Sequence, residues 1–123
     1  MNTENTIRNA DIALKAKLFV SGWQLSKDLQ KIRNNKKSAF VDIYYVENNP
    51  VAVLVVEFSY GISTLYGEKF LPIQIFVKKQ YRRNGIGTAL IKKNTIEGCS
   101  FKLSQGIQGI SDFFKVNNLQ VWH

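Results

Sequence analysis

The stretch that most constrains the fold is Phe70–Ile91, in which an apolar run leads through a basic, glycine-containing turn into a helical pattern. The run Phe70–Val77 has the length and composition of a strand, and only Pro72 and Gln74 interrupt its apolar character. Beyond the turn, apolar residues recur at helical spacing. The stretch therefore predicts a strand, a glycine loop and a helix in that order.

The glycine turn predicts a phosphate site, because such a turn exposes backbone N–H groups at the positive end of a helix dipole. Gly85 and Gly87 lack the Cβ that would block a phosphate. Four neighbouring cations add long-range attraction: Lys78, Lys79, Arg82 and Arg83. The P-loop pattern GxxxxGK(S/T) is absent, and GxGxxG fails because Leu90 replaces its third glycine. The turn instead reads R-x-x-G-x-G over 82–87.

This strand, loop and helix resemble motif A of the GNAT superfamily of N-acetyltransferases, and the resemblance extends over about residues 38–122. It implies that the loop amides bind the pyrophosphate of acetyl-coenzyme A (acetyl-CoA), with no metal. It also implies that the strand end offers its backbone to the pantetheine arm. The cofactor-binding residues implied by the resemblance are Phe76, Val77, Arg82, Arg83, Asn84, Gly85, Ile86, Gly87 and Thr88.

The length of the chain predicts a single domain over residues 1–123, and the resemblance implies an α/β (α+β) fold with a mixed central sheet and helices on both faces. The order is α-α-β-β-β-α-β-α-β, as expected for the central part of the GNAT fold, and residues 1–9 are expected to be flexible. The elements expected around the motif are helices 10–20 and 24–33, strands 40–46 and 51–58 with a turn at 47–50, a loop at 59–69, a motif helix closed by Gly98, strand 99–103, helix 106–116 and strand 119–122.

The core positions follow from the same patterns. The strand 51–58 is apolar on both faces and is expected at the centre of the sheet. Pro72 cannot donate to a ladder, so its strand is expected to be bulged or at an edge there. In the second helix, the residues expected to face the core are Trp23, Leu25, Leu29 and Ile32.

Composition limits the class of protein. The chain carries 17 Lys and Arg against 9 Asp and Glu, a formal charge of +8, which favours a polyanionic partner. The longest unbroken apolar run, 51–56, is too short to span a membrane. The single cysteine and the absence of a signal-peptide pattern at the N-terminus predict a cytoplasmic protein.

The resemblance implies transfer of an acetyl group from acetyl-CoA to an amine, and the acceptor stays open among a small molecule, a protein and tRNA. A lysine-type amine has a pKa of about 10.4, so a base must remove its proton before it can attack. The candidates for this base are Glu57 and Glu68. The family's frequent Phe-Tyr pair corresponds here to Phe113-Phe114, which lacks the hydroxyl. Two alternatives therefore stay open: a catalytically degenerate GNAT-like interaction or structural module, and a basic nucleic-acid-binding module.

The last predicted strand also bears on assembly. The family's sheet continues with a further strand after this point, whereas this sequence has length for only the strand at 119–122. Because an open apolar edge invites pairing with another chain, a homodimer through this C-terminal edge is expected. The alternative is that the N-terminal helices cover the edge.

Overall fold

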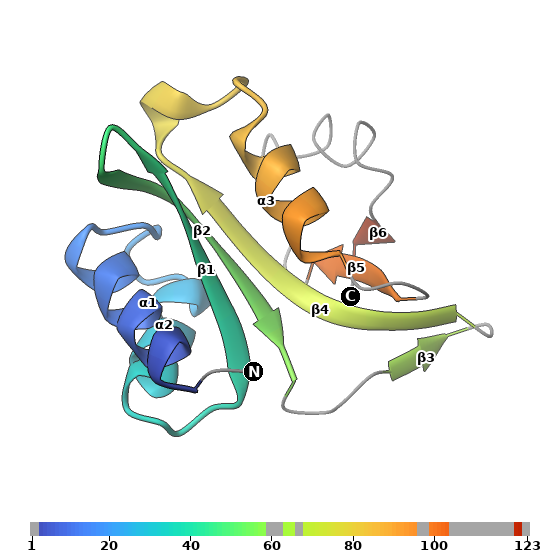
Figure 1. Ribbon diagram of the computed structural model, residues 1–123. Helices are drawn as coiled ribbons and strands as arrows, with labels where there is room; N and C mark the ends of the chain where they lie inside the picture. Colours follow the sequence, from blue (N-terminus) through green and yellow to red (C-terminus); the bar gives the residue numbers. More distant parts are fainter. Residues whose placement is uncertain (1–2, 59–62, 66–67, 96–98, 104–119, 122–123) are drawn as a thin grey trace.

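The computed structural model describes residues 3–58, 63–65, 68–95, 99–103 and 120–121. A six-stranded mixed sheet forms the middle layer, with two helices on one face and a third helix on the other (Figure 1). The core consists of two apolar clusters, one on each face of the sheet. The predicted α/β class, with helices on both faces of a mixed sheet, is confirmed.

Helices α1 (Thr3–Lys15) and α2 (Gln24–Arg33) cover the first face, where they pack on inward-facing residues of the hairpin strands. The bounds of α2 agree with the prediction, but α1 begins at Thr3 rather than near residue 10. Its first turns bury Thr6 and Ala10, small side chains that a search for large apolar residues does not detect. Trp23 was expected in the core and is instead 42% exposed, because it precedes the first turn of α2.

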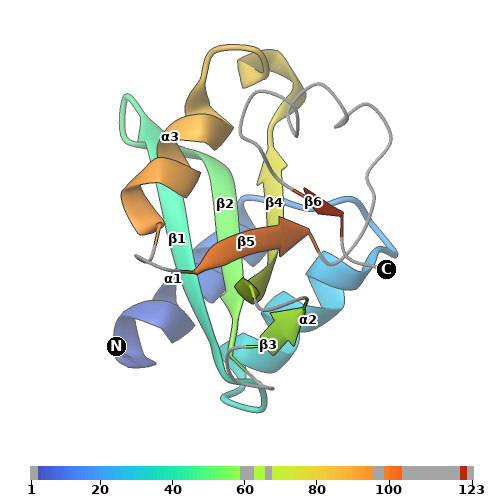
Figure 2. The same cartoon turned by 90° about the vertical axis from the view of Figure 1, so that its right-hand side faces the viewer.

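The sheet has the strand order β1-β2-β4-β5-β6, with the short strand β3 paired to the beginning of β4. Strand β2 is antiparallel to both β1 and β4, and β3 is antiparallel to β4, whereas β5 runs parallel to both β4 and β6. The order of β1, β2 and β4 can be followed in Figure 2, where β5 lies nearer the viewer. The strand bounds are β1 (Ala39–Val46), β2 (Asn49–Glu57), β3 (Ser63–Leu65), β4 (Glu68–Val77), β5 (Ser100–Leu103) and β6 (Gln120–Val121).

Strand β2 is the covered central strand that its sequence predicts, since every residue from Val51 to Glu57 is buried. The hairpin turn before it is tighter than the predicted turn at 47–50. Glu47 and Asn48 both have positive φ angles, 52° and 67°, which is the pattern of a two-residue type I′ turn. This turn matches the right-handed twist of the flanking strands, so β2 begins already at Asn49.

The position of Pro72 agrees with the expected local edge. The pairing of β4 with β2 stops at Ile73 with Val56, and its pairing with β3 begins at Phe70 with Ser63. Among the described residues, Pro72 therefore lies in a gap between β2 and β3 on that side of β4, where no ladder requires its missing N–H. The strand β3 itself was missed, because its three residues fall within the segment predicted as a loop.

The opposite face of the sheet is covered by α3 (Ile86–Asn94), which follows β4 through the short 3-10 helix η1 (Lys79–Tyr81). Ile86, Leu90 and Ile91 of α3 pack on the apolar cluster of that face. Asn94 donates a hydrogen bond of 2.9 Å to Asp42 on β1, so the carboxyl end of α3 is attached to the first strand in the sheet order. The motif thus forms the predicted strand, loop and helix.

Several predictions fall outside the described residues: Gly98, the helix 106–116, and the Phe113-Phe114 pair within it. The strand β6 lies within the predicted strand 119–122 and pairs with β5. Dimerisation through this edge stays a prediction.

Candidate active site

The loop between β4 and α3 presents backbone N–H groups at the beginning of the helix. Gly85, the N-cap of α3, adopts a left-handed conformation with φ 76°, and no side chain caps the helix there. The first described hydrogen bond of α3 runs from the amide of Ala89 to the carbonyl of Gly85, at 2.9 Å. The amides of Ile86, Gly87 and Thr88 precede that bond and have no intrahelical carbonyl to bond, which is the arrangement that binds anions.

The loop has open space where a phosphate would approach. A Cβ built on Gly85 would meet no atom within 4 Å. Arg83, Asn84 and Gly85 are all exposed, and Arg83 also has a positive φ of 66°. The residues present therefore fit an anionic group held by backbone amides, with an exposed cation beside it.

Three of the predicted cofactor-binding residues are connected to one another. The Nε of Arg82 donates a hydrogen bond of 2.8 Å to the carbonyl of Val77, and its guanidinium lies 5.5 Å from the centre of the Phe76 ring. Arg82 thus folds back onto the end of β4 rather than extending into solvent. Arg82 therefore acts as a brace, which here means that its side chain joins the loop to the end of β4. Arg83, by contrast, is exposed, and none of the described residues pairs with its side chain.

A cleft lies along the same strand, where β4 and β5 part. Strand β5 pairs with β4 only from Phe70 to Ile73, and among the described strands none pairs with 74–77 on that side. The cleft beside this open edge is predominantly apolar and also borders the connection between α1 and α2. This cleft is called the β4 cleft. Its described lining consists of Val20, Trp23, Leu25, Ile73, Gln74, Ile75, Phe76 and Leu103.

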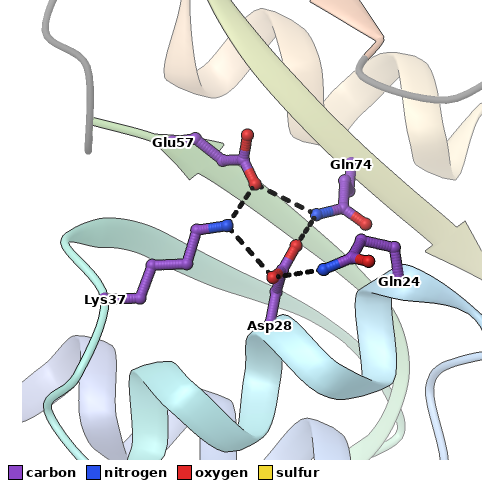
Figure 3. Close-up of polar contacts among 5 residues, drawn as sticks. All are labelled: Gln24, Asp28, Lys37, Glu57 and Gln74. Atoms are coloured by element: carbon purple, nitrogen blue, oxygen red, sulfur yellow. Dashed lines mark hydrogen bonds and ion pairs between the residues drawn. The ribbon is translucent and has the colours of Figure 1, made fainter.

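A buried polar network adjoins the β4 cleft on the α2 side of the sheet (Figure 3). Lys37 Nζ lies 3.0 Å from Asp28 Oδ1 and 2.9 Å from Glu57 Oε1. Gln74 Nε2 donates to Asp28 Oδ2 at 2.6 Å and to Glu57 Oε1 at 3.2 Å. Gln24 Nε2 donates to Asp28 Oδ1 at 2.9 Å. These five side chains, Gln24, Asp28, Lys37, Glu57 and Gln74, form the Asp28 network.

The protonation states in the Asp28 network follow from its contacts. Burial by itself would raise the pKa of Asp28, but hydrogen bonds from Gln24, Lys37 and Gln74 outweigh it and hold that pKa below its ordinary value. Burial would likewise lower the pKa of Lys37, but its hydrogen bonds to Glu57 and Asp28 and the charges of both carboxylates hold that pKa above its ordinary value. Asp28 and Lys37 are therefore both charged at neutral pH.

The two proposed bases have different positions. Glu57 is buried at the end of β2, and both of its contacts in the Asp28 network use Oε1. Figure 3 shows the second carboxylate oxygen directed away from the other four side chains. Glu68 begins β4 and pairs through its backbone with Leu65, while its side chain lies outside what the structure describes. The described contacts do not bring the two carboxylates together.

The sequence pattern missed Asp28, Lys37 and Gln74 as site residues. Gln74 did carry a signal in the sequence, because it interrupts an apolar strand. In the structure its exposed fraction is only 5%. Asp28 resembled an ordinary acidic residue of a helix first turn, and Lys37 an ordinary loop cation. The segments containing them are far apart in the chain, so no local pattern connects them.

The part of the chain that the structure describes contains no group of three or more His, Cys, Asp or Glu side chains that could hold a metal ion. None of its helices combines the length and apolar character needed to cross a membrane.

Comparison with protein families gives a match over residues 11–94 to the acetyltransferase (GNAT) family. The matched region includes α2, the first strands, the β4–α3 loop and the whole Asp28 network. No curated protein matched the chain.

Solved structures with a similar fold were also found. An aminoglycoside antibiotic 6'-N-acetyltransferase from Acinetobacter haemolyticus is 20% identical with a TM-score of 0.60, and the alignment covers 98% of this chain and 88% of that one. A "possible acetyltransferase" from Clostridium difficile 630 is 19% identical with a TM-score of 0.57, covering 100% and 89%. A predicted acetyltransferase from Clostridium acetobutylicum, solved with acetyl-CoA, is 15% identical with a TM-score of 0.55, covering 99% and 88%.

Proposed function

Because the chain belongs to the acetyltransferase (GNAT) family, we propose that it transfers an acetyl group from acetyl-CoA to an amine. The observation that carries this proposal is that β4 joins two complementary features. The anion-binding loop follows the end of β4, and the β4 cleft lies beside its unpaired edge. At about 3.3 Å per residue, the step from Val77 to Gln74 is roughly 10 Å, so one extended ligand can contact both.

In this proposal the loop holds the pyrophosphate of acetyl-CoA. The amides of Gly85, Ile86, Gly87 and Thr88 donate to its oxygens, and the side chain of Arg83 adds charge. Arg82 braces the strand end through Val77, so that the loop keeps its shape without the ligand. The bound thioester supplies the activated acyl group.

The unpaired edge of β4 then serves the reacting carbonyl. Backbone N–H groups fixed by a sheet need no reorganisation when charge develops on a carbonyl oxygen, which is why such donors favour acyl transfer. The β4 cleft is largely apolar, and water exclusion there strengthens these hydrogen bonds. The chain's contribution is thus orientation and polarisation.

The amine must lose a proton before it attacks, and we propose Glu57 or Glu68 as the base. Lys37 Nζ lies 2.9 Å from Oε1 of Glu57, and the second oxygen of Glu57 points away from the Asp28 network. Glu68 is separated from the unpaired edge by the β5-paired part of β4. A water relay would be needed to connect either carboxylate with an amine in the cleft.

The experiment compares two variants at one position of the loop. Thr88→Glu places an acidic side chain in the first turn of α3, which favours the helix but repels a phosphate. Thr88→Gln has nearly the same shape without the charge. We expect the Gln variant to bind acetyl-CoA within a few-fold of wild type by calorimetry and the Glu variant to show no binding, with both retaining the wild-type melting temperature.

Turnover is measured on the same proteins as thiol release from acetyl-CoA in the presence of a panel of amines. Amine-dependent release by wild type and by Thr88→Gln, but not by Thr88→Glu, is the expected result. Equal binding by all three proteins would overturn the loop assignment. Loop-dependent binding without thiol release for any amine would instead favour a cofactor-binding protein without catalysis.

A further inference from the structure

The orientation of the Gln74 side-chain amide is fixed by its two carboxylate partners. Ionised carboxylates only accept hydrogen bonds, so the NH₂ end of the amide must face Asp28 and Glu57, at 2.6 Å and 3.2 Å. The reverse orientation would place a carbonyl oxygen against two anions. The carbonyl oxygen Oε1 therefore lies on the other side of the amide, and Figure 3 shows it directed away from Glu57.

This carbonyl is a polar group in an apolar lining. Gln74 contributes to the β4 cleft, and the other described lining residues are aliphatic or aromatic. Gln74 is only 5% exposed, and none of the described residues donates a hydrogen bond to its Oε1. Among the described residues, the one buried side-chain polar atom without a partner is Thr6 Oγ1, so the Gln74 carbonyl is open to the cleft rather than enclosed. It can therefore accept a hydrogen bond from a ligand that brings an N–H group to this position.

The charge behind Gln74 favours the same kind of ligand. The Asp28 network contains two carboxylates and one lysine, so it carries a net negative charge. Hydrogen bonds from the Gln74 NH₂ group to these carboxylates increase the electron density on its carbonyl oxygen. Both effects favour an amine, neutral or protonated, over a carboxylate or phosphate.

The rim of the cleft indicates what the amine is attached to. Val20 and Trp23 are 39% and 42% exposed, and both line the cleft. With Tyr45 they are the large apolar side chains that the described part of the chain leaves exposed. Covering an exposed indole beside an apolar cleft with an apolar group is favourable, because it removes apolar surface from water.

We propose that Gln74 determines acceptor specificity: its carbonyl accepts a hydrogen bond from a primary amine whose apolar body packs on Trp23 in the β4 cleft. This inference rests on the proposed acetyl transfer and gives the acceptor a chemical class. The Asp28 network is then a positioning device, which holds the Gln74 amide in the orientation that accepts rather than donates.

The test measures binding of 2-phenylethylamine to the full chain in the presence of coenzyme A, by calorimetry. The matched probes are ethanolamine, which has the amine but no apolar body, and 2-phenylethanol, which has the body but no amine. We expect wild type to bind 2-phenylethylamine at least about tenfold more tightly than either probe. Against 2-phenylethanol, one hydrogen bond to a charged group can supply that factor, and against ethanolamine the burial of the phenyl ring can supply it.

Two substitutions separate recognition from structure. Gln74→Met removes the carbonyl that the proposal assigns to the amine, whereas Gln30→Met makes the same change of side chain at an exposed position of α2, outside the described lining of the cleft and outside the Asp28 network. We expect Gln74→Met to weaken 2-phenylethylamine binding about tenfold and Gln30→Met to leave it within twofold. Equal effects of the two variants would overturn the proposal.

Trp23→Ala provides the readout if Gln74→Met does not fold, because Trp23 is exposed. It should weaken 2-phenylethylamine binding and leave ethanolamine binding unchanged, and a wild type that binds both amines equally would overturn the proposal. Thiol release distinguishes the two hypotheses. Release with ethanolamine but not with 2-phenylethylamine would retain acetyl transfer and reject this acceptor class. Gln74-dependent binding without release would reject acetyl transfer and retain the specificity of the cleft.

Discussion

The β4–α3 loop and the Asp28 network both adjoin strand β4, but one is formed by the backbone and the other by side chains. The loop follows the end of β4, whereas the network contacts Gln74 within the strand. The loop uses backbone amides from a few consecutive residues and is exposed. The described side-chain contact that holds it, between Arg82 and Val77, joins it to the adjacent end of β4. The network uses side chains from α2, the loop before β1, β2 and β4, and it is largely buried. The difference implies that the loop tolerates substitutions that leave its backbone unchanged, whereas the network loses stability when any charged member is removed.

The largest expected effect is on the network. Asp28→Ala leaves Lys37 with one carboxylate and Gln74 with one acceptor, and breaking a buried charge pair in this way costs about 3–5 kcal/mol. We expect a loss of that size in the free energy of unfolding, measured by urea denaturation. The control is Asp11→Ala, which removes the exposed pairs with Lys15 and Arg33 and should lower the free energy of unfolding by no more than about 1 kcal/mol. Equal curves for the two variants would show that the network is not a stabilising unit.

The pH dependence of stability provides the next test, with a smaller effect. The pKa of Asp28 is held below its ordinary value by its hydrogen bonds, although burial opposes them. The folded state therefore binds this proton less tightly than the unfolded chain does. The resulting stability is present above about pH 4, the unfolded pKa, and is lost as the pH falls through the folded pKa.

The comparison is between wild type and Asp28→Asn, unfolded in urea at several pH values between 7 and 3. We expect the difference in unfolding free energy to be largest near pH 7 and to narrow below pH 4, because protonated Asp28 and Asn carry the same charge. A difference that stays constant over this range would assign the effect to packing rather than to the charge of Asp28.

A change in the loop tests its backbone conformation. Gly85 has φ 76°, a region that costs a residue with a Cβ about 1–2 kcal/mol, although the added atom would meet nothing within 4 Å. Gly85→Ala should therefore lower the free energy of unfolding by roughly that amount through strain alone. Gly85→Asn is the control, since Asn tolerates this conformation better, and it should cost less. Equal losses would indicate a side-chain clash instead.

The same contrast explains what could be predicted from sequence. The loop and its strand and helix lie within one continuous stretch, so their spacing alone predicted them, and in the structure they extend over residues 68–94. Hydrogen-bonded partners in the Asp28 network are up to 46 residues apart in the sequence, and only the sheet register and the packing of α2 bring them together. The predicted start of the first helix near residue 10 and the predicted burial of Trp23 were wrong for a related reason, because burial depends on which surface faces the sheet.

The smallest expected effect distinguishes two adjacent arginines in the loop. Arg82 uses Nε on the carbonyl of Val77 and lies over Phe76, whereas no described residue pairs with the side chain of Arg83. We infer that Arg82 acts through geometry and Arg83 through charge. Lysine keeps the charge but not the planar donor geometry, so Arg82→Lys should weaken acetyl-CoA binding a few-fold, as much as Arg82→Met does.

At position 83 the expected ranking of acetyl-CoA affinity among the Arg, Lys and Met side chains is different. Arg83→Lys should bind acetyl-CoA as wild type does, and Arg83→Met should lose a few-fold in affinity at low salt. Because exposed charges are screened, that loss should disappear at about 1 M salt, whereas the loss at position 82 should persist. Calorimetry of the four variants at two salt concentrations measures both. A salt-sensitive loss at position 82, with Arg82→Lys equal to wild type, would show that Arg82 contacts the phosphates and that the brace seen in the free protein opens on binding.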